Sequence, residues 1–157
     1  MPDLDELYQY MVLDHNNNPR NFKKLENPDR AANGYNPICG DKITLFLQLT
    51  NSGNPGESLI TDVGFLGSGC AISKASASMM TQSIKGKSQA EAEELFSAFR
   101  NMITKAPGSD EHNYDKLGDL SILSGVSNYP SRVKCAILSW HALRAALDGE
   151  GASISTE

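Results

Sequence analysis

Apolar residues near the start of the chain recur with the spacing of a helix. Five of them fall at positions i, i+3, i+4, i+7 and i+8 and share one face: Leu4, Leu7, Tyr8, Met11 and Val12. The segment Asn16–Pro19 contains residues that end helices, so we expect this helix to end there. Residues 20–38 contain prolines and a glycine with little periodicity, which predicts mostly loop.

A strict alternation of apolar and polar residues follows. Residues 41–50 place an apolar side chain at every second position, which is typical of a half-buried strand: Ile43, Leu45, Leu47 and Leu49. Residues 51–56 form a dense turn signal, and residues 59–66 are interpreted as a second strand. The pattern therefore predicts a hairpin with a long turn over 41–66, and with it an antiparallel sheet.

Helical patterns dominate the rest of the chain. Residues 71–84 are rich in small residues and methionine, which suits a tightly packed helix. Ser88 and Glu91 have the spacing of a capping box, which predicts that a third helix begins there. The expected apolar face of that third helix consists of Ala92, Leu95, Phe96, Phe99, Met102 and Ile103.

The segment before the last helix is harder to interpret. Residues 105–118 are polar and contain glycine, so we expect a loop or an insertion there, with a short helix over 120–126. Pro130 suits the first turn of a final helix. The apolar stripe of that helix is Val133, Ala136, Ile137, Trp140, Leu143 and Leu147.

This order of elements predicts an α+β fold. A small antiparallel sheet should carry helices packed on one face, because strands precede a run of helices instead of alternating with them. The chain has 157 residues, which fits one domain. We expect residues 1–150 to form that domain and residues 151–157 to be a flexible C-terminal tail.

Composition and charge narrow the classes of function. Hydrophobic residues make up 39% and charged residues 21%, as is usual for a globular protein in water. The net charge of −5 argues against binding a nucleic acid backbone. No apolar run approaches the roughly 20 residues that a membrane helix needs, so no membrane role is expected. The acidic N-terminus lacks the features of a signal peptide, which favours a cytoplasmic location.

The chain contains three cysteines: Cys39, Cys70 and Cys135. An odd number in a reducing compartment argues against a disulfide framework. Such cysteines are buried small apolar residues, metal ligands or reactive thiols. Spacing alone decides little among these three alternatives, because no Cys-x-x-Cys pair is present. The residues around each cysteine are more informative.

Cys39 lies two residues before Asp41, with Gly40 between them. The glycine lets the backbone turn and approach other groups closely. In an extended segment, the side chains at positions 39 and 41 would share one face. A thiolate and a carboxylate could then converge on one cation.

The other two cysteines lie at predicted helix starts. Cys70 follows the glycine-rich segment 67–69, where a helix N-terminus favours a thiolate through its N–H groups and dipole. Cys135 lies about one turn into the last helix, beside Lys134 and near Arg132, whose charges also favour a thiolate. Three thiolates and one carboxylate suit tetrahedral zinc, and an iron–sulfur cluster could use the same set. Soft thiolates make magnesium or calcium a poor choice.

Four segments, in this order, make the chain resemble the U-type iron–sulfur cluster assembly family. The resemblance covers nearly the whole chain from Leu4 to Leu147. The segments that carry it are Leu13-Asp14-His15 with Asn18-Pro19-Arg20-Asn21, Asn36-Pro37-Ile38-Cys39-Gly40-Asp41, Gly67-Ser68-Gly69-Cys70-Ala71-Ile72-Ser73 and Arg132-Val133-Lys134-Cys135-Ala136.

Two departures distinguish branches within that family. Members of the IscU branch carry a histidine just before the third cysteine, where this chain has Lys134. They also lack a long insertion between the second and third cysteines, where this chain has the polar stretch 105–118. In both respects the chain resembles the SufU branch, whose members bind zinc tightly and accept sulfur from the cysteine desulfurase SufS.

The resemblance implies a site and a function. It implies zinc ligands at Cys39, Asp41, Cys70 and Cys135, with Cys39 as the acceptor of persulfide sulfur from SufS. Downstream Suf assembly proteins would be further partners. Arg132 and Lys134 are candidate auxiliary residues, which could stabilise charge on the sulfurs or contact the desulfurase. The alternative is a scaffold on which a transient iron–sulfur cluster is assembled and passed on.

Overall fold

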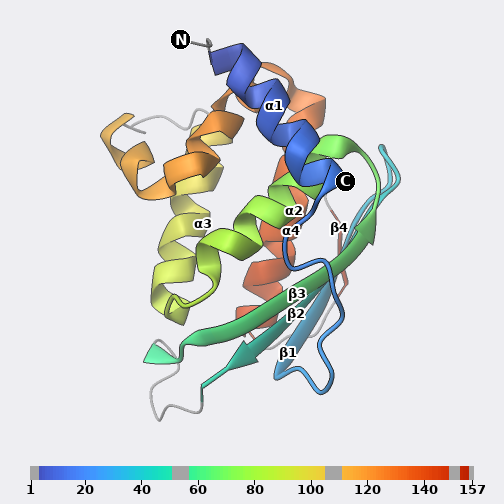
Figure 1. Ribbon diagram of the computed structural model, residues 1–157, viewed down its shortest axis with the longest axis vertical. Coiled ribbons are helices and arrows are strands. Elements are labelled where there is room, and N and C mark those ends of the chain that lie inside the picture. Colours follow the sequence, from blue (N-terminus) through green and yellow to red (C-terminus); the bar gives the residue numbers. More distant parts are fainter. Residues whose placement is uncertain (1–3, 51–56, 105–110, 149–152, 156–157) are drawn as a thin grey trace.

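The computed structural model describes residues 4–50, 57–104, 111–148 and 153–155. The helices lie on one side of a twisted sheet (Figure 1). They are α1 (Leu4–Asn17), α2 (Ala71–Ile84), α3 (Gln89–Thr104), the 3₁₀ helix η2 (Glu111–Asn128) and α4 (Pro130–Asp148). The strands are β1 (Arg30–Asn36), β2 (Asp41–Leu49), β3 (Ile60–Ser68) and β4 (Ser153–Ser155).

The sheet has the strand order β3-β2-β1-β4. The pairs β2–β3 and β1–β2 are antiparallel, so the hairpin predicted over 41–66 is confirmed. Ile43, Leu45 and Leu47 are almost fully buried, as their alternation predicts. Helices α2 and α4 contact the sheet on this face, and the predicted α+β class is confirmed.

The prediction of mostly loop over 20–38 was wrong for residues 30–36, which form β1. Strand β1 pairs along its whole length with β2, from Arg30 opposite Leu47 to Asn36 opposite Asp41. Its inward positions are Ala32, Gly34 and Asn36, and all three are buried. Two small residues and an amide give no apolar alternation. Pairing with β2 therefore decides the strand, and local propensity does not.

The stretch 105–118 also differs from expectation. Residues 105–110 lie outside the described part of the chain, and residues 111–118 belong to η2 instead of a loop. Four residues of η2 at every third position are buried: Leu117, Leu120, Leu123 and Val126. That spacing matches the three residues per turn of a 3₁₀ helix. The short helix expected over 120–126 is the later part of this element.

The chain end departs from the expected flexible tail at three residues. Ser153–Ser155 form β4, which pairs parallel to β1 from Asn33 opposite Ser153 to Tyr35 opposite Ser155. The other positions of the 151–157 tail lie outside the described residues. A three-residue strand has no periodicity of its own, so no pattern of residues predicts it.

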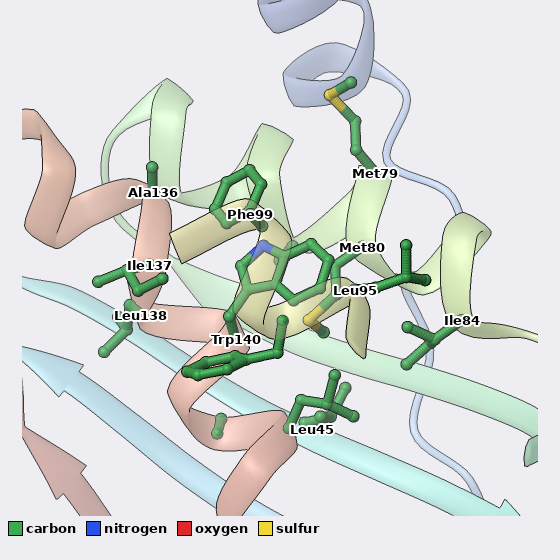
Figure 2. Packing of buried hydrophobic residues seen from close by; sticks show 14 of the residues in the cluster. Leu45, Met79, Met80, Ile84, Leu95, Phe99, Ala136, Ile137, Leu138 and Trp140 are labelled. Carbon is green, nitrogen blue, oxygen red and sulfur yellow. The ribbon is translucent and has the colours of Figure 1, made fainter. Parts of the chain in front are cut away.

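Helix α4 is the centre of the core. The predicted stripe is buried, except for the half-buried Val133, and further residues on other faces of α4 are buried too, because this helix lies between the sheet and the other helices. Trp140 stacks on Phe99 with ring centroids 4.6 Å apart (Figure 2). The indole Nε1 of Trp140 donates to Ser76 Oγ at 3.3 Å. Gly34 of β1 lies so close to Leu138 that a Cβ there would be 3.0 Å from the leucine side chain. The glycine lets α4 pack closely on the sheet.

A second buried cluster joins α1 to α2, and its side chains are polar. His15, which is 2% exposed, has Nδ1 2.7 Å from the Ser78 hydroxyl, and the backbone N–H of Arg20 donates to the same oxygen at 2.8 Å. The amide of Asn21 donates to Thr81 Oγ1 at 3.1 Å. We call His15, Asn21, Ser78 and Thr81 the α1–α2 polar cluster. Its hydrogen bonds fix α1 against the helical layer.

Candidate metal centre

The four predicted ligands come from two connections at one end of the sheet and from the start of helix α4. Cys39 lies in the turn of residues 37–40 between β1 and β2, and Asp41 is the first residue of β2. Cys70 is the N-cap of α2, directly after β3. Cys135 is on α4, one turn in from its start. The β1–β2 turn and the β3–α2 connection lie at the same sheet end because β2 is antiparallel to both neighbours (Figure 1).

Three of the four side chains form one tight group. Ligand atoms of Cys39, Asp41 and Cys135 all lie within 4.8 Å of one another. The sulfurs of Cys39 and Cys135 are 3.2 Å apart. Cys70 is outside this group of three, but its sulfur is 3.9 Å from Asp41 Oδ2. All four predicted ligands are therefore neighbours. The Asp41 carboxylate is close both to the Cys39–Cys135 pair and to Cys70.

Asp41 is fully buried, which is unusual for a carboxylate. Its Oδ1 accepts the backbone N–H of Cys70 at 2.7 Å, and its Oδ2 accepts Nδ2 of Asn36 at 3.2 Å. Gly69 has φ of +143°, and a Cβ at this position would overlap the Asp41 carboxylate. Only glycine allows the β3–α2 connection to pass this close to Asp41.

Cys70 is held by the start of α2. Its backbone is extended, and its sulfur accepts the N–H of Ser73 at 3.4 Å. This is the position of an N-cap, at which a side chain accepts from a free helix N–H. The predicted helix start at Cys70 is confirmed, with the Ser73 N–H directed at the Cys70 sulfur.

Cys39 reaches the site by a different route from the one expected. An extended Cys39–Asp41 segment was expected to put both side chains on one face. The structure has a turn at residues 37–40 instead, with Gly40 in the left-handed region at φ +72°. The turn folds Cys39 back toward Cys135. Cys39 remains partly exposed, whereas Cys135 is 1% exposed.

The site concentrates acidic groups in a buried space. The pKa of the Cys135 thiol is raised far above its usual range, first by burial and then by hydrogen bonds with Cys39 and Asp41 and the charge of Cys70. These neighbours oppose ionisation of the Cys135 thiol, since like charges at short range raise the pKa of an acid. A divalent cation would reverse that balance and allow the thiolates to form.

The two candidate auxiliary residues differ in position. Arg132 is exposed, and the pKa of its guanidinium is raised by a hydrogen bond with Cys135 and by the charges of Cys70 and Cys135. Its charge therefore reaches the sulfurs. Lys134 is half-exposed, and within the described residues it makes no hydrogen bond or ion pair with the four predicted ligands.

The donor set fits a tetrahedral cation of the zinc type. With Zn–S bonds of about 2.3 Å, the edges of a tetrahedron between two sulfurs are about 3.8 Å. The sulfurs of Cys39 and Cys135, at 3.2 Å, are somewhat closer than that edge, and the Cys70 sulfur is 3.9 Å from an oxygen of Asp41. Cys70 would complete the set as the fourth ligand. The soft thiolates favour zinc or an iron–sulfur cluster over magnesium or calcium.

Two residues near the site were not singled out from the sequence as site residues. Asn36 lies in the segment 36–41 but was assigned to a loop. As the last inward position of β1, it is buried against Asp41 and Cys135. Period-two burial along β1 would have located it, had the strand been recognised. Tyr8 was assigned to the apolar stripe of α1. Burial raises the pKa of its hydroxyl, and charges of Arg132 and Cys70 act on it, which places α1 beside the site.

Comparison with known protein families and sequences gives a consistent result. The profile of the family described as "NifU-like N terminal domain" matches residues 7–136. The zinc-dependent sulfurtransferase SufU of Bacillus subtilis is 41% identical over 148 residues, which cover 94% of either chain. The iron–sulfur cluster assembly scaffold protein IscU of Streptococcus pyogenes is 38% identical over 92% of this chain and 84% of that protein.

Solved structures agree with the sequences. A protein from Fervidobacterium islandicum, described as a candidate iron–sulfur cluster assembly scaffold for the SUF system, superposes with a TM-score of 0.73 at 32% identity. The match covers 90% of this chain and 97% of that one. The N-terminal part of a NifU-like protein from Brucella abortus has the same fold, with a TM-score of 0.76 at 22% identity and coverage of 93% and 95%.

Proposed function

Because the chain belongs to the family of NifU-like N-terminal domains, we propose a specific role for it within iron–sulfur cluster assembly. The chain is an assembly protein of the IscU/SufU type. Within that type, we propose a zinc-dependent sulfurtransferase that takes persulfide sulfur from a SufS-type cysteine desulfurase through Cys39. The relative from Bacillus subtilis bears that description.

One observation carries the proposal. Cys39 is the partly exposed member of the site and lies in a turn, whereas Cys70 caps a helix and Cys135 is buried within one. A cysteine that accepts sulfur has to leave the metal to meet the persulfide of a large partner. A turn residue can do so at a smaller loss of packing than a residue in a helix.

The transfer step follows from thiol chemistry. The Cys39 thiolate attacks the outer sulfur of the desulfurase persulfide. A new S–S bond forms on Cys39, the S–S bond of the desulfurase breaks, and the electron pair leaves with the desulfurase thiolate. Bound zinc would supply a deprotonated thiolate at neutral pH. Thiols that accept sulfur must stay reduced, so the proposal includes a cytoplasmic setting.

The surface around Cys39 suits a protein partner. Ile38 beside it is 65% exposed, and Tyr129 at the start of α4 is 62% exposed. Arg132 adds a cation whose field reaches the sulfurs. Exposed apolar and aromatic residues next to a functional side chain are typical of interfaces. We propose this surface as the docking site for the desulfurase, and Arg132 as the auxiliary residue that guides the negatively charged persulfide.

The proposal also covers membranes, nucleic acids and further protein partners. None of the helices in the described residues has the length and apolarity to cross a bilayer. The proposal includes no nucleic acid and no membrane partner, and it includes downstream Suf assembly proteins as recipients of the sulfur. Lys134 stays a candidate for contact with a partner, since it is half-exposed and, among the described residues, makes no hydrogen bond or ion pair with the four ligands.

The scaffold alternative differs in what the site holds. Several similar proteins are described as IscU scaffolds, and the same donors suit a cluster. We propose zinc because Lys134 replaces the histidine that the IscU branch carries at this position. Metal analysis after aerobic purification separates the two. One zinc per chain supports the transferase, and an oxygen-sensitive chromophore that can be transferred to an acceptor supports the scaffold.

The direct test maps the sulfur. Zinc-loaded protein is incubated with a SufS-type desulfurase and cysteine, and peptides are analysed by mass spectrometry without reductant. We expect an adduct of about 32 Da, one sulfur atom, mainly on Cys39. The Cys39→Ser variant should keep its fold and show no adduct. An adduct mainly on Cys70 or Cys135 in the parent protein would overturn the assignment.

A further inference from the structure

Asn36 is fully buried at the base of the metal site. Its side-chain nitrogen lies within hydrogen-bonding distance of two candidate ligands at once. Nδ2 is 3.2 Å from Asp41 Oδ2 and 3.5 Å from the Cys135 sulfur. The sheet sets the first contact, because Asn36 of β1 is directly opposite Asp41 in the β1–β2 ladder. The packing of α4 on the sheet sets the second.

The orientation of the Asn36 amide follows from its neighbours. Among the described residues, its Oδ1 has no hydrogen-bond partner although it is buried. The opposite orientation would place Oδ1 against the Asp41 carboxylate and leave the NH₂ group without an acceptor. A buried polar atom without a partner lowers the stability of the fold. An apolar residue of similar volume would avoid that loss, so the donor group must serve the site and not the fold.

The hydrogen bonds divide the four ligands into two classes. Asp41 is held by the Cys70 N–H and by Asn36, Cys70 is held by the Ser73 N–H, and Cys135 is held by Asn36. Cys39 differs, because its sulfur contacts the sulfur of Cys135, which is itself another candidate ligand. Three ligands are therefore fixed by neighbouring donor groups, and the proposed sulfur acceptor is the one that can move.

We propose that Asn36 is a positioning residue of this site. Its two N–H groups hold Asp41 and Cys135 in place, so that these residues and Cys70 keep the cation on the protein when Cys39 leaves to accept sulfur. The holding role rests on the geometry alone, and the timing relative to Cys39 rests on the proposed function. Donors behind the ligands commonly change metal affinity 10- to 100-fold.

The first test measures zinc dissociation without any desulfurase. Zinc-loaded Asn36→Ala and Asn36→Leu are mixed with excess chromogenic chelator, and the second variant keeps most of the buried volume. We expect zinc to leave both variants about 10- to 100-fold faster than the parent protein. The matched control is Asn33→Ala, since Asn33 is an exposed asparagine on the same strand and binds Thr44. This control should release zinc at the parental rate.

Two further readouts separate positioning from folding. The Co²⁺-substituted Asn36 variants should show altered sulfur-to-metal charge-transfer bands, while Asn33→Ala retains the parental spectrum. Melting temperatures of the metal-free proteins should differ little between Asn36→Leu and the parent protein. Parental zinc release in Asn36→Leu would overturn the proposal. So would failure of both Asn36 variants to fold with zinc bound, because the role would then be structural.

A double-variant comparison tests the link to Cys39. In the Cys39→Ser background, Asn36→Leu should accelerate zinc loss by a larger factor than it does with Cys39 present, because fewer ligands then remain. An equal or smaller factor would overturn the idea that Asn36 retains the cation while Cys39 is away. None of these rates involves sulfur transfer. If Cys39 takes up no persulfide, the proposed function fails while these results stand.

Discussion

Two buried polar clusters of this protein differ in how well their groups are paired. In the α1–α2 polar cluster, the donors and acceptors of His15, Asn21, Ser78 and Thr81 are matched at ordinary distances. At the metal centre, the Asn36 oxygen has no partner among the described residues, two sulfurs are 3.2 Å apart, and burial opposes ionisation of Cys135. Both clusters are buried, and only one is satisfied by the chain itself.

The difference separates a structural cluster from a functional one. A satisfied buried network stabilises and fixes a single arrangement. The acidic groups of the metal centre are crowded and poorly paired within the protein. A group from outside the chain has to stabilise them, and a cation is the simplest such group. Residues of the first cluster should therefore affect stability with zinc present or absent, and residues of the second should act through zinc.

Removal of zinc should have the largest effect. Ligand at about 1,000 times its dissociation constant stabilises a protein by about 4 kcal/mol. For a chain of this size, that corresponds to a fall in melting temperature of about 10 °C after chelation. The apolar core around Trp140 should keep the metal-free protein folded at 25 °C. Calorimetry before and after verified metal removal checks this, and an unchanged curve would contradict it.

Loss of one hydroxyl in the α1–α2 polar cluster should come next. Ser78→Ala removes the oxygen that binds His15 and the Arg20 N–H, at a loss of about 2–3 kcal/mol. The melting temperature should fall by roughly 5–10 °C, by the same amount with and without zinc. Ser83→Ala on the same helix is the matched control, since Ser83 is half-exposed and bonds only locally. A change in zinc dissociation in Ser78→Ala would break the comparison.

Asp41→Asn should show the opposite signature. The amide keeps an oxygen for the Cys70 N–H but removes the buried charge. Zinc should dissociate at least about 10-fold faster, while the metal-free protein should be equally stable or up to about 1 kcal/mol more stable, as is common for functional residues. Chelator kinetics and denaturant titration check the two parts. If metal-free Asp41→Asn is strongly destabilised, the carboxylate is structural.

The smallest effect should be a dependence on pH. The pKa of His15 is lowered, mainly by burial and then by Arg20. The unfolded chain therefore binds this proton at a higher pH, near 6.5, than the native protein does. The stabilisation should be complete above about pH 6.5 and should be lost as the pH falls toward the native pKa. Denaturant titration of the metal-free protein from pH 8 to pH 5 measures it.

His141 provides the control for that titration, because burial and two arginines lower its pKa too. His141→Gln should retain the part of the pH dependence that belongs to His15. A variant at position 15 should lose that part. Stability that stays constant or rises as the pH falls would show that neither buried imidazole contributes.

The sequence predicted the elements that carry their own periodicity. The alternation of Ile43, Leu45 and Leu47 fixed β2, and the Ser88–Glu91 capping box is formed as expected, with the Ser88 hydroxyl accepting the Glu91 N–H at 3.1 Å. Strand β1 has no such pattern, because small and polar residues line its inner side. It exists through its pairing with β2 across the turn at residues 37–40, and the residue pattern of β1 alone does not reveal that pairing.

The sequence predicts the four candidate ligands but not the groups that hold them in place. Motif chemistry pointed to Cys39, Asp41, Cys70 and Cys135, and the structure makes them neighbours. The role of Asn36 depends on register and on the approach of α4, and both are tertiary properties. Gly69 is similar, since its lack of a side chain matters only because the Asp41 carboxylate lies against it.

The last residue pair of the β1–β2 ladder lies next to the turn that holds Cys39, and this limits how far Cys39 can move. The pairing ends at Asn36 opposite Asp41, so Cys39 is tethered two residues from a fixed anchor. Two extended residues span at most about 7 Å. While the ladder holds, the sulfur therefore sweeps only a short radius around the end of the sheet. If Cys39 accepts sulfur as proposed, the donor enzyme would have to carry its persulfide nearly the whole distance, on a segment long enough to reach this turn.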